Sequence, residues 1–375
     1  MSNKVYFKGL NGIRAIAAMI VLIFHIDQFT YFFGLKSIGF HYTSMATYGV
    51  ILFFVLSGFL ITRLLLIEKD KFQKIDLPKF YYRRILRIWP IYYLLVLIAI
   101  IIYFSAPHII YYKDGKVLTT FLLYSFLLSN IAYGLGFTIT PITPLWSVGT
   151  EEQFYAFWPF LLGKSKNILK TLIYFILAYL SLKIFLRFIN EHGVYYRLIN
   201  LCCFDCMAIG GIGAYLVHNK SKYLKFLFSP FSQVISWLFL FVSVFYKPVH
   251  LFSVIDTEVH ALFYLVIILN VSENSKTIIN LENKIFDFIG RISYGIYVYH
   301  VTVMILLSQI FKHVFNYLPT NSLLDYILVF AITIITVLGI SYLSFNYFES
   351  YFLKLKNKYS KIESDTNMQK SPHSL

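Results

Sequence analysis

The sequence predicts an all-α protein, a polytopic transmembrane helical bundle with about ten crossings and one partial or re-entrant element. The first reason is composition: 58% of residues are hydrophobic, 14% are charged, and the mean hydropathy is +0.67. An ordinary soluble domain does not show this balance. The second reason is that apolar stretches of about 17 to 25 residues, the length of a membrane span, recur to the C-terminal region. One bundle over residues 1–352 fits better than several soluble domains, with residues 353–375 expected as a basic, disordered cytoplasmic tail.

Eleven apolar segments follow one another along the chain. They are 10–28, 47–67, 89–106, 118–136, 146–162, 168–189, 203–218, 232–247, 256–272, 291–312 and 324–348. The first has no small-residue cleavage site and carries Arg14, so it is interpreted as a retained helix and not as a signal peptide.

The net charge of +15 lies mostly in loops, which argues against nucleic-acid binding and for membrane topology. Seven cations occupy one loop: Lys69, Lys71, Lys74, Lys79, Arg83, Arg84 and Arg87. Placing this loop, both termini and the later lysine clusters in the cytoplasm requires that one segment between 107 and 163 does not fully cross. Segment 146–162 is the weakest span because it contains Glu151, Glu152 and Pro159. Charged backbone at membrane depth is tolerated where it lines a protein cavity. The number of crossings that the charged loops require therefore predicts a functional site in segment 146–162.

Arg14 and His25 lie within the first apolar segment. Ionisable groups inside a membrane are costly and tend to mark functional sites. On a helix the two residues are separated by about 16 Å along the axis, roughly half the hydrocarbon thickness. Arg14 is thus expected near one membrane surface, either because it has a role in the site or because its side chain extends its charge to the aqueous interface. His25 is expected deep in the bundle.

The chain resembles the integral-membrane acyltransferase family 3 over nearly its whole length. The resemblance rests on Arg14 and His25, and on GVILFFVLSGFLIT at 49–62, YYRRILRIWPIYYLL at 81–95 and LWSVGTEEQFYAFWP at 145–159. Weaker echoes are FDCMAIGGIGAYL at 204–216, GRISYGIYVYH at 290–300 and NYFES at 346–350. Two departures are Ile51, where relatives often have an acid, and Ser350 with Tyr351, where they have arginine and proline after Glu349. With no hydrolase-like extension after the last span, the chain is expected to be the stand-alone form.

The resemblance implies acyl transfer to a hydroxyl, for which His25 is the candidate base. A histidine with an ordinary pKa of about 6.5 is readily set near working pH. The alternative is a neutral histidine hydrogen-bonded inside the bundle, and the sequence leaves open direct transfer or an acyl-enzyme. Glu151 is expected to orient His25, as the acid of a triad does. Glu151 and Glu152 point about 100 degrees apart on a helix, so only one is expected to face the cavity. Both could instead be solvated interfacial charges or pair with arginines.

Arginines at the start of the 89–106 segment are candidates for binding the acyl donor. Guanidinium groups suit phosphates, and Arg83 and Arg87 share a helix face while Arg84 is displaced. Without the resemblance, membrane topology or lipid phosphate would explain them better. With it, Arg87 and Arg84, together with Arg83, are expected to hold the phosphates of acetyl-coenzyme A. Arg14 is a candidate catalytic-site residue that could hold the donor or orient the site.

Further polar and aromatic residues are weaker candidates for substrate binding: Trp146, Ser147, Glu152 and Asp205. Trp146 could instead belong to an interfacial belt, and Asp205 could pair with a cation. His300 is a second-tier site candidate. Cys202, Cys203 and Cys206 lack a second ligand pair, so no metal is expected. Most of the 31 tyrosines and 38 phenylalanines are expected in belts and helix packing, although such rings can stack on sugars.

The resulting hypothesis is an inner-membrane O-acetyltransferase that moves acetyl from acetyl-coenzyme A, with no permanently bound cofactor, to a polysaccharide or lipid-linked sugar. A succinyl donor or a small-molecule acceptor is an alternative within this class. Outside it, a lipid-linked glycan flippase or transporter would also show intramembrane charge, and a non-catalytic scaffold would need His25 only for stability. Hydride transfer, ATP hydrolysis and serine hydrolase chemistry have no motif in the sequence.

Overall fold

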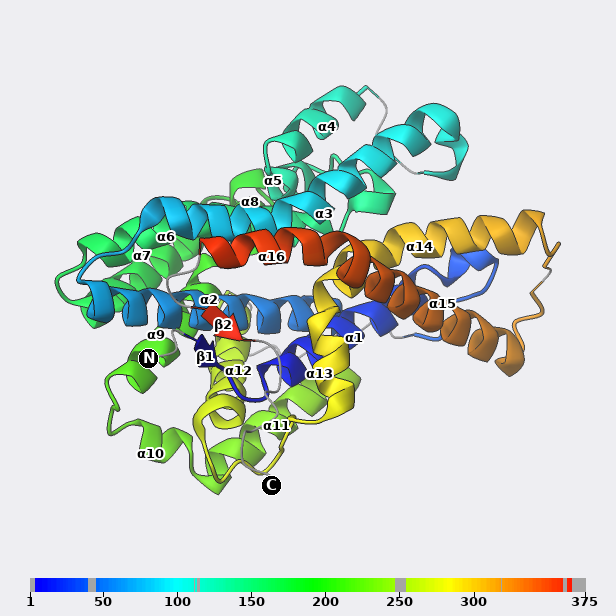
Figure 1. Cartoon of the computed structure of the whole chain (residues 1–375). Coiled ribbons are helices and arrows are strands. Elements are labelled where there is room, and N and C mark those ends of the chain that lie inside the picture. The colour runs from blue at the N-terminus through cyan, green and yellow to red at the C-terminus, as the bar shows by residue number, and fades with distance from the viewer. Residues whose placement is uncertain are drawn as a thin grey trace.

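The computed structural model describes residues 4–39, 45–110, 112, 115–246, 254–317, 319–359 and 363–365. It is a helical bundle (Figure 1), which confirms the all-α prediction. Within the described residues, seven helices are long and apolar enough to cross a membrane. The prediction of ten crossings therefore remains a prediction, because some expected spans are formed by shorter or less apolar helices.

The helices follow the predicted segments closely. The first nine are α1 (Leu10–Gln28), α2 (Met45–Phe72), α3 (Leu77–Ser105), α4 (Val117–Ser125), α5 (Ser129–Gly134), α6 (Leu145–Lys164), α7 (Ile168–Ile189), α8 (Val194–Cys202) and α9 (Phe204–His218). The remaining seven are α10 (Leu224–Leu227), α11 (Pro230–Phe245), α12 (Asp256–Glu273), α13 (Lys284–Arg291), α14 (Ser293–His313), α15 (Leu323–Leu343) and α16 (Ser350–Lys358).

Two predicted spans are interrupted. Segment 118–136 divides into α4 and α5 at Leu127, whose φ of 60° no helix can continue. The start of segment 291–312 also breaks, because Ile292 ends α13 and α14 begins at Ser293. Helix α6, the segment chosen by parity, is not among the seven span candidates.

The predicted boundary at residue 352 lies inside a helix. A π-helical stretch, Ser344–Glu349, continues α15 directly into α16, which packs beside α3 (Figure 1). Residues 353–358, the first of the expected tail, thus belong to this helix. Farther on, Glu363–Asp365 (β2) pairs in parallel with Lys4–Tyr6 (β1). Residues 360–362 and 366–375 of the expected tail lie outside the described residues.

Helices α2 and α9 form the most extensive contact of the bundle because glycines let their backbones meet. A Cβ atom on Gly58 would lie 1.9 Å from the carbonyl oxygen of Met207, and one on Gly210 would lie 2.1 Å from that of Val55. These distances are far below any allowed contact, so each position requires glycine. The close pair fixes α2, which forms one wall of the cavity described below.

Replacing Gly58 with alanine should destabilise the bundle by about 1–3 kcal/mol, because the added methyl forces the α2 and α9 backbones apart. Gly339→Ala on α15 is the matched control, since its Cβ would meet no atom within 4 Å. Melting of the purified protein in detergent, followed by size-exclusion chromatography, measures the effect. Equal melting temperatures for the two variants would contradict this account of the packing.

Candidate active site

One cavity brings together half of the site residues predicted from the sequence. It lies among α1, α2, α3, α6 and α14 and encloses about 1160 Å³, including the space at its mouth. Its lining includes Arg14, Arg84, Arg87, Ser147 and Glu151. Three cations and a carboxylate thus converge from helices far apart in sequence. We call it the arginine cavity.

Arg84 and Arg87 present unused hydrogen-bond donors to this cavity. The Arg84 guanidinium lies 5.5 Å from the ring centre of Tyr155 and 5.7 Å from that of Phe80, and its buried Nε has no hydrogen-bond partner. Arg87 makes no hydrogen bond to the described residues, although the carboxylates of Glu151 and Glu349 lie close enough to interact with its charge. Unsatisfied guanidinium groups at membrane depth are costly. An anionic ligand in the cavity would satisfy them.

Arg14 is held in place by a short polar chain. Its Nη1 donates to Asn11 Oδ1 at 2.8 Å, and Asn11 Nδ2 donates to Asp287 Oδ1 at 2.7 Å. Asp287 also pairs with Arg291 at 2.9 Å. Because these contacts tie α1 to α13, the guanidinium has a fixed position in the cavity wall.

Arg83 does not belong to the cavity, which corrects one expected donor contact. Its Nη2 lies 3.2 Å from Glu68 Oε2, and its Nη1 donates to the carbonyl of Tyr359 at 3.3 Å. Both Arg83 and Arg87 lie on one helix, but the buried Glu68 draws the first toward α2. Arg83 and Arg87 were expected to share a helix face, but it is Arg84 and Arg87 that line the cavity together.

Glu151 faces the cavity as predicted but does not contact His25. Its Oε2 accepts from the Tyr155 hydroxyl at 3.2 Å, and Tyr155 in turn is hydrogen-bonded to Ser57. Its charge acts on Arg14, Arg84 and Arg87. The expected role of orienting His25 was therefore wrong, because α6 places this carboxylate beside the arginines.

The neighbouring candidates on α6 have separate surroundings. Glu152 accepts from the indole Nε1 of Trp89 at 2.7 Å and is not part of the cavity lining. Trp146 also lies outside the lining and stacks on Tyr133 with ring centres 5.5 Å apart. Ser147 does line the cavity, where its Oγ lies 2.7 Å from the hydroxyl of Tyr297. Of the three predicted substrate contacts on this helix, only Ser147 is positioned to meet a molecule in the cavity.

His25 forms a pair with His300 near the far end of the cavity. His300 Nε2 lies 3.0 Å from His25 Nδ1, and the rings stack with centres 4.8 Å apart. Tyr297, which lines the cavity, has its ring centre 6.1 Å from that of His300. Neither histidine belongs to the cavity lining, and Tyr297 is the lining residue that links the cavity to the pair.

The hydrogen bonds of His300 assign the tautomer of His25. His300 Nδ1 lies 3.3 Å from the carbonyl of Ile296, which can only accept, so this nitrogen carries the proton. In a neutral His300 the Nε2 atom then accepts, and His25 Nδ1 must donate to it. With this tautomer the lone pair of His25 lies on Nε2. This is the arrangement a general base requires.

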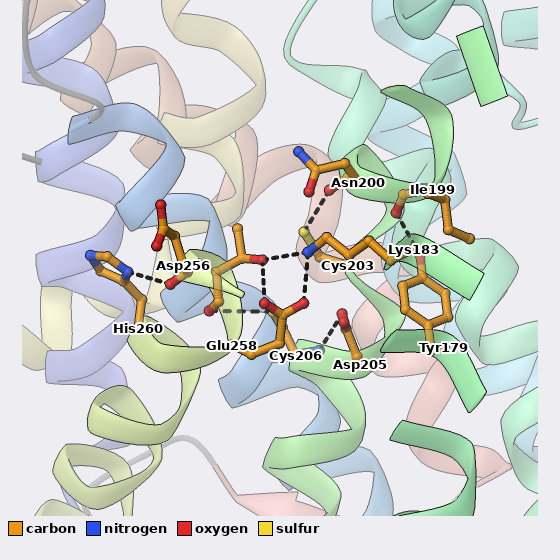
Figure 2. A network of polar contacts seen from close by, with 11 residues as sticks. Tyr179, Lys183, Ile199, Asn200, Cys203, Asp205, Cys206, Asp256, Glu258 and His260 are labelled. Atoms are coloured by element: carbon orange, nitrogen blue, oxygen red, sulfur yellow. Dashed lines mark hydrogen bonds and ion pairs between the residues drawn. The ribbon is translucent and has the colours of Figure 1, made fainter. Parts of the chain in front are cut away.

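Asp205 lies in a different polar cluster, shown in Figure 2, which corrects its expected role in the site. Its Oδ1 accepts from the backbone N–H of Cys206 at 2.9 Å. Beside it, Lys183 Nζ lies 2.7 Å from Glu258 Oε1, and both side chains are buried. The cluster joins α7, α9 and α12. The three cysteines are free, and the described residues contain no group of three His, Cys, Asp or Glu side chains arranged to hold a metal.

Two residues of this region were not predicted as site residues from the sequence. Tyr297 and Glu349 lie within the GRISYGIYVYH and NYFES echoes, and His300 ends the first of them. Tyr294, Tyr297 and His300 recur at spacings of three on α14, which places them along one helix face. This periodicity was the available signal for Tyr297. The position of Glu349 near Arg87 depends on the π-helical turn, which the sequence does not reveal.

Comparison with known proteins now identifies the family. The acyltransferase domain family matches residues 7–345. The chain belongs to this family. The match covers α1 to α15, and thus the cavity and the histidine pair. No solved structure matches the chain at a significant level.

Individual relatives of this acyltransferase family member are O-acetyltransferases by name. The O-acetyltransferase OatA of Staphylococcus aureus is 34% identical over 200 residues, which are 51% of this chain and 31% of OatA. The peptidoglycan O-acetyltransferase OatA of Listeria monocytogenes is 33% identical over 162 residues, or 42% of this chain and 24% of the relative. A putative O-acetyltransferase of S. aureus is 27% identical over 327 residues, which are 80% of this chain and 51% of that protein. The aligned regions thus span about half of these relatives or less.

Lys183→Met should destabilise the protein by about 3–5 kcal/mol without weakening donor binding, because it leaves the Glu258 carboxylate buried and unpaired. The double variant Lys183→Met/Glu258→Leu should recover part of the melting temperature, since it removes the unpaired Glu258 carboxylate while the buried Asp205 remains. Melting in detergent and donor titration at low temperature measure the two effects. If Lys183→Met lowered the affinity for the acyl donor as much as substitution of Arg84 or Arg87 does, the cluster around Asp205 would be part of the substrate site after all.

Proposed function

We propose that this protein is a membrane O-acetyltransferase that moves the acetyl group of acetyl-coenzyme A to a hydroxyl of a cell-envelope polysaccharide. The observation that carries the proposal is the convergence of Arg14, Arg84 and Arg87 on one cavity, whose lining residue Tyr297 has its ring centre 6.1 Å from that of His300. The names of the OatA relatives supply the reaction class and, for one of them, peptidoglycan as acceptor. A lipid-linked sugar precursor carries the same hydroxyls and is included in the proposal.

The donor binds through its phosphates. Arg84 and Arg87 offer planar donors that match phosphate oxygens, and Arg14 adds a third positive charge. The cavity continues to Ser147 and Tyr297, so the pantetheine arm can lie along it with its thioester toward the histidines. Glu151 balances part of the cationic charge while the donor is absent.

His25 takes the proton of the acceptor hydroxyl on Nε2 as the oxygen attacks the acetyl carbonyl carbon. The carbon–sulfur bond of the thioester breaks, an ester forms, and the coenzyme A thiolate leaves and takes up a proton. His300 accepts the Nδ1–H of His25 and holds the ring in the basic tautomer. Such general-base catalysis contributes about 10²–10⁴-fold to the rate.

The arginine end of the bundle faces the cytoplasm in this proposal, so the protein lies in the inner membrane with both termini cytoplasmic. Lys69 Nζ donates to the carbonyls of Leu162 and Ser165, each at 3.0 Å, which brings the ends of α2 and α6 together. Basic residues follow both helices, as the positive-inside rule expects of cytoplasmic loops. Acetyl-coenzyme A would then enter from the compartment in which it is made.

Arg87→Gln and Arg84→Gln should each raise the KM for acetyl-coenzyme A by about tenfold or more, since a hydrogen bond to a charged group contributes roughly 1.5–3 kcal/mol. Arg83→Gln is the matched control on the same helix and should leave this KM unchanged, because Arg83 lies outside the cavity. Initial rates in membranes with labelled acetyl-coenzyme A provide the measurement. Equal KM values in all three variants would remove the arginine cavity from donor binding.

His25→Ala should abolish transfer of labelled acetyl to purified envelope glycan, measured as base-labile ester at matched protein abundance. His300→Phe should lower kcat by about a hundredfold while leaving the donor KM unchanged, because it removes only the acceptor of the Nδ1–H. His313→Ala, at an exposed position on the same helix as His300, is the control.

Full transfer by His25→Ala would discard the proposed base. Movement of glycan across the membrane without consumption of coenzyme A would instead support a flippase or transporter. Preferred use of succinyl-coenzyme A would keep the enzyme and change the donor.

A further inference from the structure

A series of aromatic rings leads away from His25 on the side opposite the arginine cavity. Phe29 stacks on His25 with ring centres 5.9 Å apart and an interplanar angle of 20°. Phe32 continues the stack at 5.3 Å and 8°, and Tyr31 lies 4.4 Å from Phe32. Tyr31 is 59% exposed, so the series runs from the proposed base to the surface of the protein.

We propose that Phe29, Tyr31 and Phe32 form a binding subsite for a pyranose ring of the acceptor glycan. This inference rests on the proposed function, since it concerns the substrate that His25 would deprotonate. A pyranose presents a face of C–H groups that packs on an aromatic ring, while its hydroxyls seek hydrogen bonds at the edge. An aromatic face continuous with the catalytic imidazole would bring a sugar hydroxyl toward His25 Nε2.

Polar groups for the edge of the sugar are present beside these rings. Gln28 is exposed, follows His25 by three residues and so lies next to it on the α1 surface. Neither the Gln28 amide nor the Tyr31 hydroxyl is hydrogen-bonded to any of the described residues. An amide and a phenol beside a stacking surface are suited to sugar hydroxyls and N-acetyl groups.

The aromatic segment is held in a defined position, which separates it from a simple belt of interfacial side chains. Thr30 Oγ1 donates to the carbonyl of Asp27 at 2.8 Å and fixes the turn that carries Tyr31 and Phe32. The buried Asp27 carboxylate accepts from Ser37 Oγ and from the backbone N–H of Ile38, both at 2.7 Å. Such preorganisation lowers the entropy cost of binding. Belt residues at a membrane surface need only depth and no fixed contact to a catalytic group.

Tyr31→Leu and Phe32→Leu should raise the KM for the glycan about two- to tenfold per ring, with kcat and the KM for acetyl-coenzyme A unchanged. The matched controls are Tyr195→Leu and Phe188→Leu, which replace rings that are 73% and 90% exposed and distant in sequence from His25. The controls should leave all three constants unchanged. A glycan KM raised equally by test and control variants would assign these rings to the membrane interface and overturn the subsite.

Binding measured without turnover separates this inference from the proposed reaction. The probe is a soluble oligosaccharide of alternating N-acetylglucosamine and N-acetylmuramic acid, added to the protein in nanodiscs and observed by saturation-transfer NMR. Transfer to the pyranose C–H protons in the wild type that is lost in Tyr31→Leu and Phe32→Leu supports the subsite, even if no acetyl transfer occurs. No transfer in the wild type, or the same transfer in all variants, overturns the subsite while leaving the donor and base experiments to decide the reaction.

Discussion

The burial of three guanidinium groups in an apolar bundle is the constraint on which the site depends. Arg14, Arg84 and Arg87 line one cavity, where the positive charges of Arg84 and Arg87 act on Arg14. Glu151 and Glu349 lie within range of Arg87 and offset part of this cost. With two carboxylates and three guanidinium groups ionised, the site carries a net positive charge, which the phosphates of the proposed donor would neutralise. The π-helical turn before α16 has a role in this balance, because it carries Glu349, whose carboxylate interacts with the charge of Arg87.

Helices α1 and α14 together set the distance between the two halves of the site. Helix α1 carries Arg14 near its start and His25 near its end, about 16 Å farther along the axis. Helix α14 packs beside it and presents Tyr294 and Tyr297 to the cavity and His300 to His25. Because all these groups lie on two packed helices, their spacing cannot change without disrupting the core. In the proposed reaction, the phosphates and the reacting hydroxyl would therefore bind at positions fixed by secondary structure.

The sequence allowed the helices to be predicted closely because apolar periodicity and length are local properties. Segments 10–28 and 168–189 coincide with α1 and α7, and parity selected α6, which carries Glu151 into the cavity. What could not be predicted was which polar side chains meet. Arg83 is drawn away by Glu68, Glu151 faces arginines and not His25, and Asp205 joins Lys183 and Glu258. These pairings depend on helix rotation and on contacts between distant segments. The His300 partner of His25 is 275 residues away in the chain, a distance that no local pattern encodes.

A histidine pair buried between helices offers a specific advantage for chemistry inside a membrane. A carboxylate beside His25 would have to remain ionised at membrane depth, where desolvation opposes charge. A neutral imidazole orients the base through one hydrogen bond and adds no charge to the resting site. Its cost is weaker stabilisation of the imidazolium that forms during transfer. The net positive arginine cavity lies on one side of this pair and the aromatic surface on the other. The developing imidazolium is therefore best stabilised by the substrates themselves, so proton transfer would be favoured only when donor and acceptor are both bound, which would also limit wasteful hydrolysis of the thioester.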